Sequence, residues 1–153
     1  MMSVKERLSE LGLELPDVPE PVAAYVPGVR EGKLLFTSGQ IPAVDGELVY
    51  QGKVGDVFTV EVGYKAARLC ALNALAVLAN LAGGIENIKR ILKVTGFVNS
   101  AAGFSDQPKV VNGASELFVD LFGQAGQHAR SAVACNELPL DSAVEVEVIA
   151  VMK

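Results

Sequence analysis

The sequence predicts an α+β fold of two layers, in which a mixed β-sheet carries two helices on one face. Residues 59–82 and 107–122 have apolar side chains at helical spacings, and each segment is followed by glycine. Strand-like segments precede, separate and follow them, in the order ββ(β)-α-β-α-ββ. Because two helices cannot cover both faces of a sheet of that size, we expect both on the same face.

A short helix and a proline-rich connector are expected over residues 1–21, in front of a domain that spans residues 22–153. Ser3 and Glu6 have the spacing of a capping box, and Gly12 suits the left-handed position after a helix. The connector contains prolines, which favour an extended chain: Pro16, Pro19 and Pro21.

A β-hairpin is predicted at the start of the domain. Residues 23–29 and 33–38 are strand-like, and the loop between them, residues 30–32, ends in a glycine that can adopt a positive φ. Asp45-Gly46 is a second turn signal, and residues 48–50 form a short strand-like segment after it.

The first long helix should begin after Thr59, which suits the N-cap, and end at Gly83-Gly84. Residues 88–99 are rich in β-formers and predict a strand before the second helix. Two further strands are predicted after that helix, at residues 129–136 and 143–152.

The last strand has a clear alternation that assigns its two faces. Val144, Val146 and Val148 point one way, while Glu145, Glu147 and Ile149 point the other. The second face is not wholly polar, because it also carries residues such as Val133 and Val151. An apolar sheet face that no helix covers is typical of a surface buried by another copy of the chain, so we expect a homo-oligomer.

Composition excludes several classes of protein. Half of the 153 residues are hydrophobic and 20% are charged, so the chain can bury a core and is not intrinsically disordered. It has 13 Lys and Arg against 18 Asp and Glu, a net charge of −5. Nucleic-acid surfaces need clustered positive charge, so this balance argues against a nucleic-acid partner.

Metal, cofactor and membrane functions find no support. The candidate nitrogen and sulfur ligands are Cys70, Cys135 and His128, which are too few and too scattered for a zinc site. No phosphate-binding or dinucleotide-binding glycine motif is present, so no cofactor is expected. The longest uncharged run, residues 69–85, is too short and too polar for a membrane span of about 20 apolar residues. We interpret both cysteines as reduced core residues of a cytoplasmic protein.

Arg130 is the most informative polar residue, because it falls inside a predicted apolar strand. A guanidinium loses hydration when it is buried and needs a partner. The structural interpretation pairs it with Glu145 or Glu147 on a neighbouring strand. The functional interpretation is a fork that grips the two oxygens of a ligand carboxylate.

Other candidates also have two interpretations. Glu145 is either a solvated strand residue or, in a subunit interface, a carboxylate that orients a water. Tyr25 is either a packed strand aromatic or a hydroxyl that reaches a ligand. Residues 37–40, Thr-Ser-Gly-Gln, form either a simple turn or a cradle for a small anion.

Taken together, these segments resemble the Rid family of reactive-intermediate deaminases, formerly called YjgF proteins and often labelled L-PSP endoribonucleases. The resemblance covers about residues 22–153. It rests on the order and spacing of six short motifs: Ala-Tyr-Val-Pro-Gly-Val (24–29), Leu-Phe-Thr-Ser-Gly-Gln-Ile-Pro (35–42), Val-Asn-Gly-Ala-Ser-Glu-Leu-Phe (111–118), Ala-Arg-Ser-Ala-Val (129–133), Leu-Pro (138–139) and Val-Glu-Val-Glu-Val-Ile-Ala-Val (144–151).

The resemblance implies a chorismate-mutase-like fold and a homotrimer with clefts between its subunits. By position, Arg130 matches the arginine that holds the substrate carboxylate, and Glu145 matches the carboxylate that positions the attacking water. The remaining positions that match the substrate-binding cleft are Tyr25, Ser38, Gly39, Asn112 and Ala132. We expect Tyr25 and Ser38 to line the same cleft as Arg130, with at least one of them supplied by the neighbouring subunit.

The reaction implied is hydrolysis of a 2-imino or enamine acid to a 2-keto acid and ammonia, without metal or cofactor. The chain differs from the usual family pattern at two positions, where His128 replaces a proline and Ala132 replaces a cysteine. Two other functions stay open: a trimer that binds small carboxylates without turning them over, and the endoribonuclease activity of the older family label.

Overall fold

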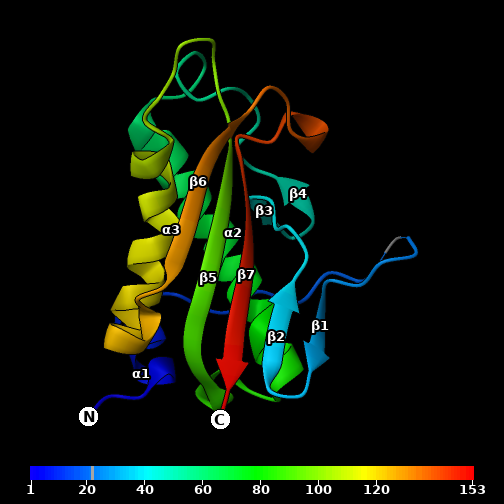
Figure 1. Cartoon of the computed structure of the whole chain (residues 1–153), viewed down its shortest axis with the longest axis vertical. Coiled ribbons are helices and arrows are strands. Elements are labelled where there is room, and N and C mark those ends of the chain that lie inside the picture. Colours follow the sequence, from blue (N-terminus) through cyan, green and yellow to red (C-terminus); the bar gives the residue numbers. More distant parts are fainter. Residues whose placement is uncertain (22) are drawn as a thin grey trace.

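The computed structural model describes residues 1–21 and 23–153; Val22, the expected first residue of the domain, lies outside the described residues. Its larger sheet has the strand order β1-β2-β7-β5-β6, and β3 pairs with β4 in a separate hairpin (Figure 1). The strands are β1 (Gly28–Glu31), β2 (Leu34–Thr37), β3 (Ala43–Val44), β4 (Glu47–Leu48), β5 (Ile88–Asn99), β6 (Ala129–Cys135) and β7 (Val144–Met152). The helices are α1 (Val4–Glu10), α2 (Val60–Ala82) and α3 (Gln107–Phe122), with short 3-10 turns η1 (Ile85–Asn87), η2 (Gly123–Gly126) and η3 (Pro139–Asp141).

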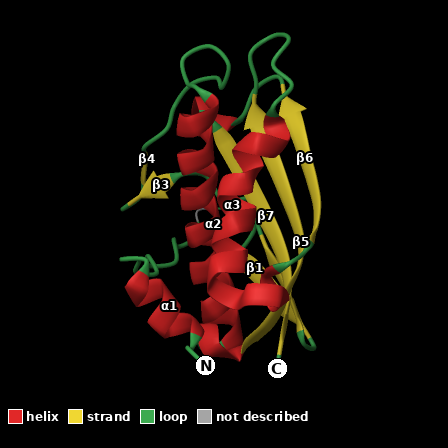
Figure 2. Ribbon diagram, turned by 90° about the vertical axis from the view of Figure 1, so that its left-hand side faces the viewer, coloured by secondary structure: helices red, strands yellow, loops and turns green. Residues whose placement is uncertain are grey.

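The predicted two-layer arrangement is confirmed. Both long helices pack on one face of the larger sheet, and Figure 2 shows them as a separate layer beside the strands. Most neighbouring strands are antiparallel, but β5 and β6 are parallel and α3 crosses between them. This crossover places α3 directly against the edge strand β6.

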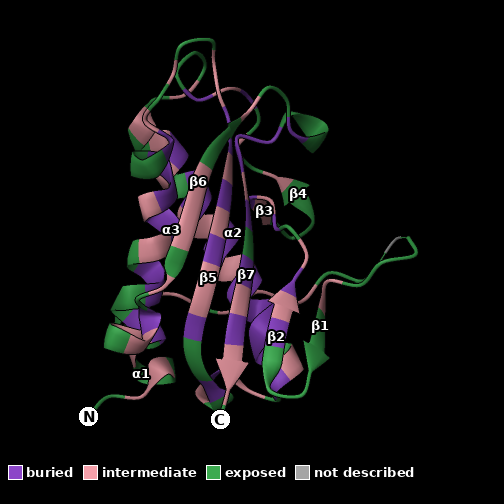
Figure 3. Cartoon of the chain, viewed as in Figure 1, coloured by how far each residue is buried: buried purple, intermediate pink, exposed green. Residues whose placement is uncertain are grey.

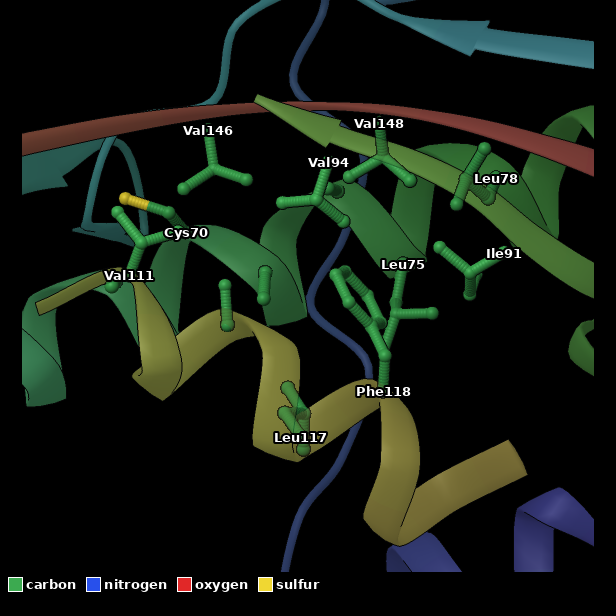
Figure 4. Packing of buried hydrophobic residues seen from close by; sticks show 14 of the residues in the cluster. Cys70, Leu75, Leu78, Ile91, Val94, Val111, Leu117, Phe118, Val146 and Val148 are labelled. Atoms are coloured by element: carbon green, nitrogen blue, oxygen red, sulfur yellow. The ribbon is translucent and has the colours of Figure 1, made fainter. Parts of the chain in front are cut away.

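The core lies between the helices and the sheet. Side chains from β5 and β7, including Val94, Val146 and Val148, meet Leu75 of α2 and Phe118 of α3 (Figure 4). Aliphatic residues dominate this core, as the shortage of aromatics in the sequence predicts. At about 25 cal/mol per Å² of buried apolar surface, such packing is the main source of stability.

Local sequence signals fix the helix ends. Thr59 accepts a hydrogen bond from the Val62 amide, and Gly83 ends α2 with a φ of 73°. At the N-terminus, Ser3 and Glu6 form the predicted capping box around the first turn of α1. Leu8 of this short helix is buried in the main core, so α1 is packed onto the domain.

Helix α2 is long and apolar enough to cross a membrane by length and composition alone. Most of its surface is nevertheless buried inside the fold, where Ala71, Ala74 and Leu78 are fully enclosed. It is therefore the central helix of a globular core.

Along β7 and most of β5, residues that point to the open face of the sheet alternate with buried residues that point to the helices (Figure 3). It carries apolar side chains that this chain leaves largely uncovered: Val29 is 52% exposed, Leu34 40% and Val133 43%. Polar residues interrupt the same face, and a shallow hollow there is lined by Lys93 and Glu147 among others.

Two strand predictions in the first third of the chain were wrong. The strand expected at residues 23–29 is displaced to β1, and residues 23–27 are irregular, because Pro27 has no amide hydrogen for a ladder. The hairpin loop is Gly32-Lys33, with Gly32 at a φ of 59°. The strand expected at residues 48–50 is only the tail of the small β3–β4 hairpin.

Candidate active site

Arg130 lies on the helix-facing side of β6, beside the buried Val94 of β5. Its Nη1 donates to Asn112 Oδ1 at 2.8 Å and to Ser115 Oγ at 3.2 Å, both on α3. The acidic partner that the structural interpretation requires is not found: within residues 1–21 and 23–153, no ion pair includes Arg130. Glu145 lies on the opposite, open face of the sheet. The charge of Arg130 is therefore solvated and held by neutral groups.

This arrangement leaves a defined part of the guanidinium available. The Nη1 nitrogen of the guanidinium has two N–H bonds, enough for its two acceptors, Asn112 and Ser115. The Nε and Nη2 hydrogens form a second fork on the other side of the planar group. Among the described residues they have no hydrogen-bond partner, so this fork can receive both oxygens of one carboxylate.

Asn112 was among the predicted site residues, but Ser115 was missed. The two are three positions apart on α3 and therefore share the face that looks toward β6. That spacing is the signal that could have found Ser115, once Asn112 had been selected. Ala132 lies two residues after Arg130 on the same side of β6, where its methyl group packs against the core.

His128, at the start of the same strand, was also not recognised as part of this group. Its Nε2 lies 2.9 Å from Ser115 Oγ, and its Nδ1 lies 2.6 Å from the carbonyl oxygen of Gly126. The ring packs edge-on against Phe118, with the ring centres 5.8 Å apart. Burial lowers the pKa of His128, the positive charge of Arg130 lowers it further, and the Gly126 carbonyl partly offsets both.

Glu145 belongs to a second group on the open face of the sheet. Burial raises the pKa of its carboxyl group, and the neighbouring negative charge of Glu147 raises it further. Gly39 lies directly against the carboxylate, since a Cβ at that position would stand 2.8 Å from the Glu145 Cδ. The residue at position 39 must therefore be small to leave room for the acid.

Ser38 and Tyr25 lie near this second group. The Ser38 hydroxyl donates to the Val26 carbonyl oxygen at 2.6 Å, and the Ser38 amide donates to the Pro27 carbonyl oxygen at 2.7 Å. These bonds fasten the segment that carries Tyr25 beside Gly39. Tyr25 itself is 60% exposed, so in this chain it is not a packed strand aromatic.

The candidate residues thus form two groups that one chain does not bring together. Arg130, Asn112 and Ala132 lie between β6 and α3. Glu145 and Gly39, with Ser38 and Tyr25 nearby, lie on the open face or at its edge. A site that uses both groups has to take them from two copies of the chain. In the described part of the chain, no three metal-ligating side chains gather at one place.

The chain is similar to known proteins over nearly its whole length. Residues 5–152 match the family described as "YjgF/chorismate mutase-like, putative endoribonuclease". A curated relative, protein TCP17 of Trypanosoma cruzi, is 40% identical over 147 residues, which cover 95% of this chain and 92% of TCP17. A crystal structure of protein Atu1372 from Agrobacterium tumefaciens, whose function is unknown, superposes with a TM-score of 0.89. It is 41% identical and covers 98% of this chain and 94% of that one.

A third relative has a name that includes an activity. "Putative reactive intermediate deaminase TdcF" of Escherichia coli is 32% identical over 139 residues, which cover 91% of this chain and 95% of TdcF. A crystal structure of TdcF with bound serine superposes with a TM-score of 0.65, covering 92% of this chain and 95% of that one. Serine carries a carboxylate and an amino group on one carbon.

Proposed function

This chain belongs to the YjgF/chorismate mutase-like family, and from that premise we propose that it hydrolyses 2-imino or enamine acids to 2-keto acids and ammonia. The observation that carries the proposal is the environment of Arg130. Neutral groups hold one side of its guanidinium, and the Nε–Nη2 fork on the other side is available for a carboxylate. The name of TdcF, and the serine in its crystal structure, support a substrate with a carboxylate next to a C–N bond.

In the proposed reaction, the fork of Arg130 binds the substrate carboxylate and fixes the position of the C=N carbon. Glu145 from a neighbouring copy accepts a proton from a water molecule, whose oxygen forms a bond to that carbon. The substrate reacts as the iminium, so the π electrons of its C=N bond move to nitrogen and give a neutral amine, which takes the proton that Glu145 received from water. The C–N bond of this protonated carbinolamine then breaks with its electrons going to nitrogen, the hydroxyl oxygen forms the C=O bond and returns its proton to Glu145, and a keto acid and ammonia leave.

The raised pKa of Glu145 suits this role, because a carboxylate in a partly buried site is a stronger base than one in water. Gly39 keeps the acid in place, and Tyr25 with Ser38 completes the wall of the cleft. An iminium carbon is already electrophilic, so the proposed chemistry requires neither metal nor cofactor. We propose a homotrimer, since the uncovered apolar face of the sheet provides a surface on which copies can pack. We also propose a cytoplasmic location, because both cysteines are unpaired.

The direct test measures ammonia and keto-acid release from a freshly generated 2-imino acid. Arg130→Ala should lower kcat/KM by tenfold to several thousandfold, because each charge-assisted hydrogen bond contributes about 1.5–3 kcal/mol. Arg130→Lys should also lose activity, since an ammonium cannot form the planar fork. Arg30→Ala is the matched control, because Arg30 lies exposed on β1 and, among the described residues, its side chain donates only to the Gly32 carbonyl. Wild-type activity in a folded Arg130→Ala variant would defeat the mechanism.

Two alternatives give different results in the same experiment. A carboxylate-binding protein without turnover would bind a keto acid through Arg130 and release no ammonia. An endoribonuclease would cleave RNA, and the net charge of −5 argues against electrostatic attraction of that polyanion.

A further inference from the structure

The donor and acceptor of each hydrogen bond around Ser115 can be assigned from the groups at the two ends of the series, the Gly126 carbonyl and the Arg130 guanidinium. At one end, a carbonyl oxygen can only accept, so His128 Nδ1 must carry the proton that faces Gly126. At the other end, a guanidinium can only donate, so Ser115 Oγ must accept from Arg130 Nη1. In a neutral imidazole, Nε2 then has a lone pair, and the Ser115 hydroxyl donates to it. The series of hydrogen bonds therefore runs from Arg130 through Ser115 and His128 to the Gly126 carbonyl.

A second proton on His128 would disturb this order. Nε2 would become a donor, and Ser115 Oγ would accept from two cations at once, while its own hydrogen would have to turn elsewhere. The positive charge next to Arg130 would also increase. A negatively charged ligand on the Nε–Nη2 fork would relieve that repulsion. This attraction acts on the charge itself, whereas the disturbed hydrogen bond only loosens the orientation of the fork, so we expect protonation of His128 to strengthen carboxylate binding.

We propose that His128, acting through Ser115, is a positioning residue for the Arg130 guanidinium, and that protonation of its ring is coupled to binding of a carboxylate by Arg130. The inference rests on the proposed function, which makes Arg130 the carboxylate site. Ser115 fixes the Nη1 side of the group while His128 fixes the rotation of the Ser115 hydroxyl, so the fork keeps one orientation. Because the two binding events are linked, carboxylate binding changes the affinity of His128 for a proton by the same factor as protonation of His128 changes the affinity of Arg130 for the carboxylate.

The electrostatic surroundings support a direct coupling between these two residues. Arg130 is the charged group that acts on His128, and its positive charge lowers the pKa of the ring. Five other charged side chains on β5 and α3 are bonded to different partners, and Lys89 at the start of β5 is exposed. The five are Arg90, Lys93, Lys109, Glu116 and Asp120.

The single histidine of the chain makes the test direct, because every imidazole signal belongs to His128. The ring is followed by heteronuclear NMR between pH 5 and 8 in the Glu145→Gln background, which removes the other candidate group that could titrate with the ligand. The probe is 2-oxobutanoate, a stable 2-keto acid that stays ionised over this range. The free protein should show the neutral ring with its proton on Nδ1 and a pKa below the ordinary value. A saturating concentration of 2-oxobutanoate should raise that pKa, and the affinity of the protein for 2-oxobutanoate should increase severalfold as the pH falls.

Two variants separate positioning from a merely structural contribution. His128→Leu removes the acceptor for the Ser115 hydroxyl and should weaken binding of 2-oxobutanoate about three- to tenfold at pH 8. His128→Gln provides an amide oxygen at a similar reach, so it should bind the probe more tightly than the Leu variant, without the change in affinity below pH 7. Thermal unfolding of both variants identifies any loss of fold, and the ring titration itself, in the Glu145→Gln background, needs no substitution at position 128.

The outcomes separate the two proposals. If the probe binds through Arg130 but leaves the His128 titration unmoved, or if His128→Gln retains the same pH dependence, the coupling is overturned and the proposed function stands. If the protein neither binds the probe nor releases ammonia from the imine, the proposed function fails and the coupling fails with it. The coupling is supported if the probe shifts the pKa of His128 and if the affinity of His128→Gln for the probe does not depend on pH. This holds even for a protein that binds the acid without turning it over.

Discussion

Gly39 is the residue whose size most directly controls the second half of the candidate site. A Cβ there would collide with the end of the Glu145 side chain, and the backbone at this position does not require glycine for its conformation. We therefore expect Gly39→Ala to displace the carboxylate and lower kcat/KM about 10- to 100-fold. The melting temperature should change little, because only the end of a flexible side chain has to move. A large loss of stability with unchanged activity would contradict this role.

The ionisation of Glu145 should make both the stability and the activity of the protein depend on pH. Its pKa is raised in the folded chain, so the folded state holds a proton that the unfolded state releases, and stability falls as the pH rises through that window. Glu145→Gln cannot ionise and avoids this cost. We expect the variant to melt at a higher temperature than wild type at pH 7, with the difference shrinking toward pH 4. Thermal scans across this range provide the check, and a Gln variant that is less stable at pH 7 would show that the carboxylate has a favourable partner in the assembled protein.

At the scale of elements, the close crossing of α2 and α3 depends on Gly113. A Cβ at this position would lie 2.9 Å from the backbone carbonyl carbon of Tyr64 and 3.1 Å from the Arg68 amide nitrogen. Helix propensity alone favours alanine over glycine by about 1 kcal/mol. The clash is with backbone, which cannot move aside, so we expect Gly113→Ala to destabilise the protein by about 1–3 kcal/mol. Urea unfolding measures the change in the free energy of unfolding and its sign, and Lys65→Ala on the exposed side of α2 is the control.

The helices could be predicted well from the sequence, because their signals are local. The capping box at Ser3 and the Thr59 cap lie within four residues of the groups they bond. The boundaries of β1 could not be predicted, since a strand ends where its partner ends, and on this side of β2 the pairing runs over residues 28–31. Pairing across the sheet is set by contacts that are distant in sequence.

The sequence could select candidate site residues but not their arrangement. The motifs selected Arg130 and Glu145, and the alternation of β7 assigned Glu145 to the open face. Strand β6 is made largely of small side chains and has no clear alternation, so the sequence did not reveal that Arg130 faces α3. His128 and Ser115 were missed for the same reason: their significance depends on the helix that packs beside the strand.

For the whole molecule, the separation of the two groups makes a prediction about mixed assemblies. We expect light scattering to show a homotrimer. Arg130→Ala and Glu145→Gln chains should each be inactive. Refolded together in equal amounts, they should recover about a quarter of the wild-type activity, because one site in four combines an intact Arg130 with an intact Glu145 from its neighbour. A monomer at micromolar concentration, or no recovery in a confirmed mixed trimer, would exclude a site shared between chains.

The crossover from β5 through α3 to β6 also has a genetic consequence. Asn112 and Arg130 lie only 18 residues apart, so the half of the candidate site that we propose to bind the carboxylate is encoded by one contiguous stretch of sequence. Its counterpart is assembled from distant stretches of the chain, since Gly39 and Glu145 meet only in the folded sheet. If Arg130 binds the substrate carboxylate as proposed, replacing this one short stretch of sequence should change which acids bind, while the residues around Glu145 keep their identity.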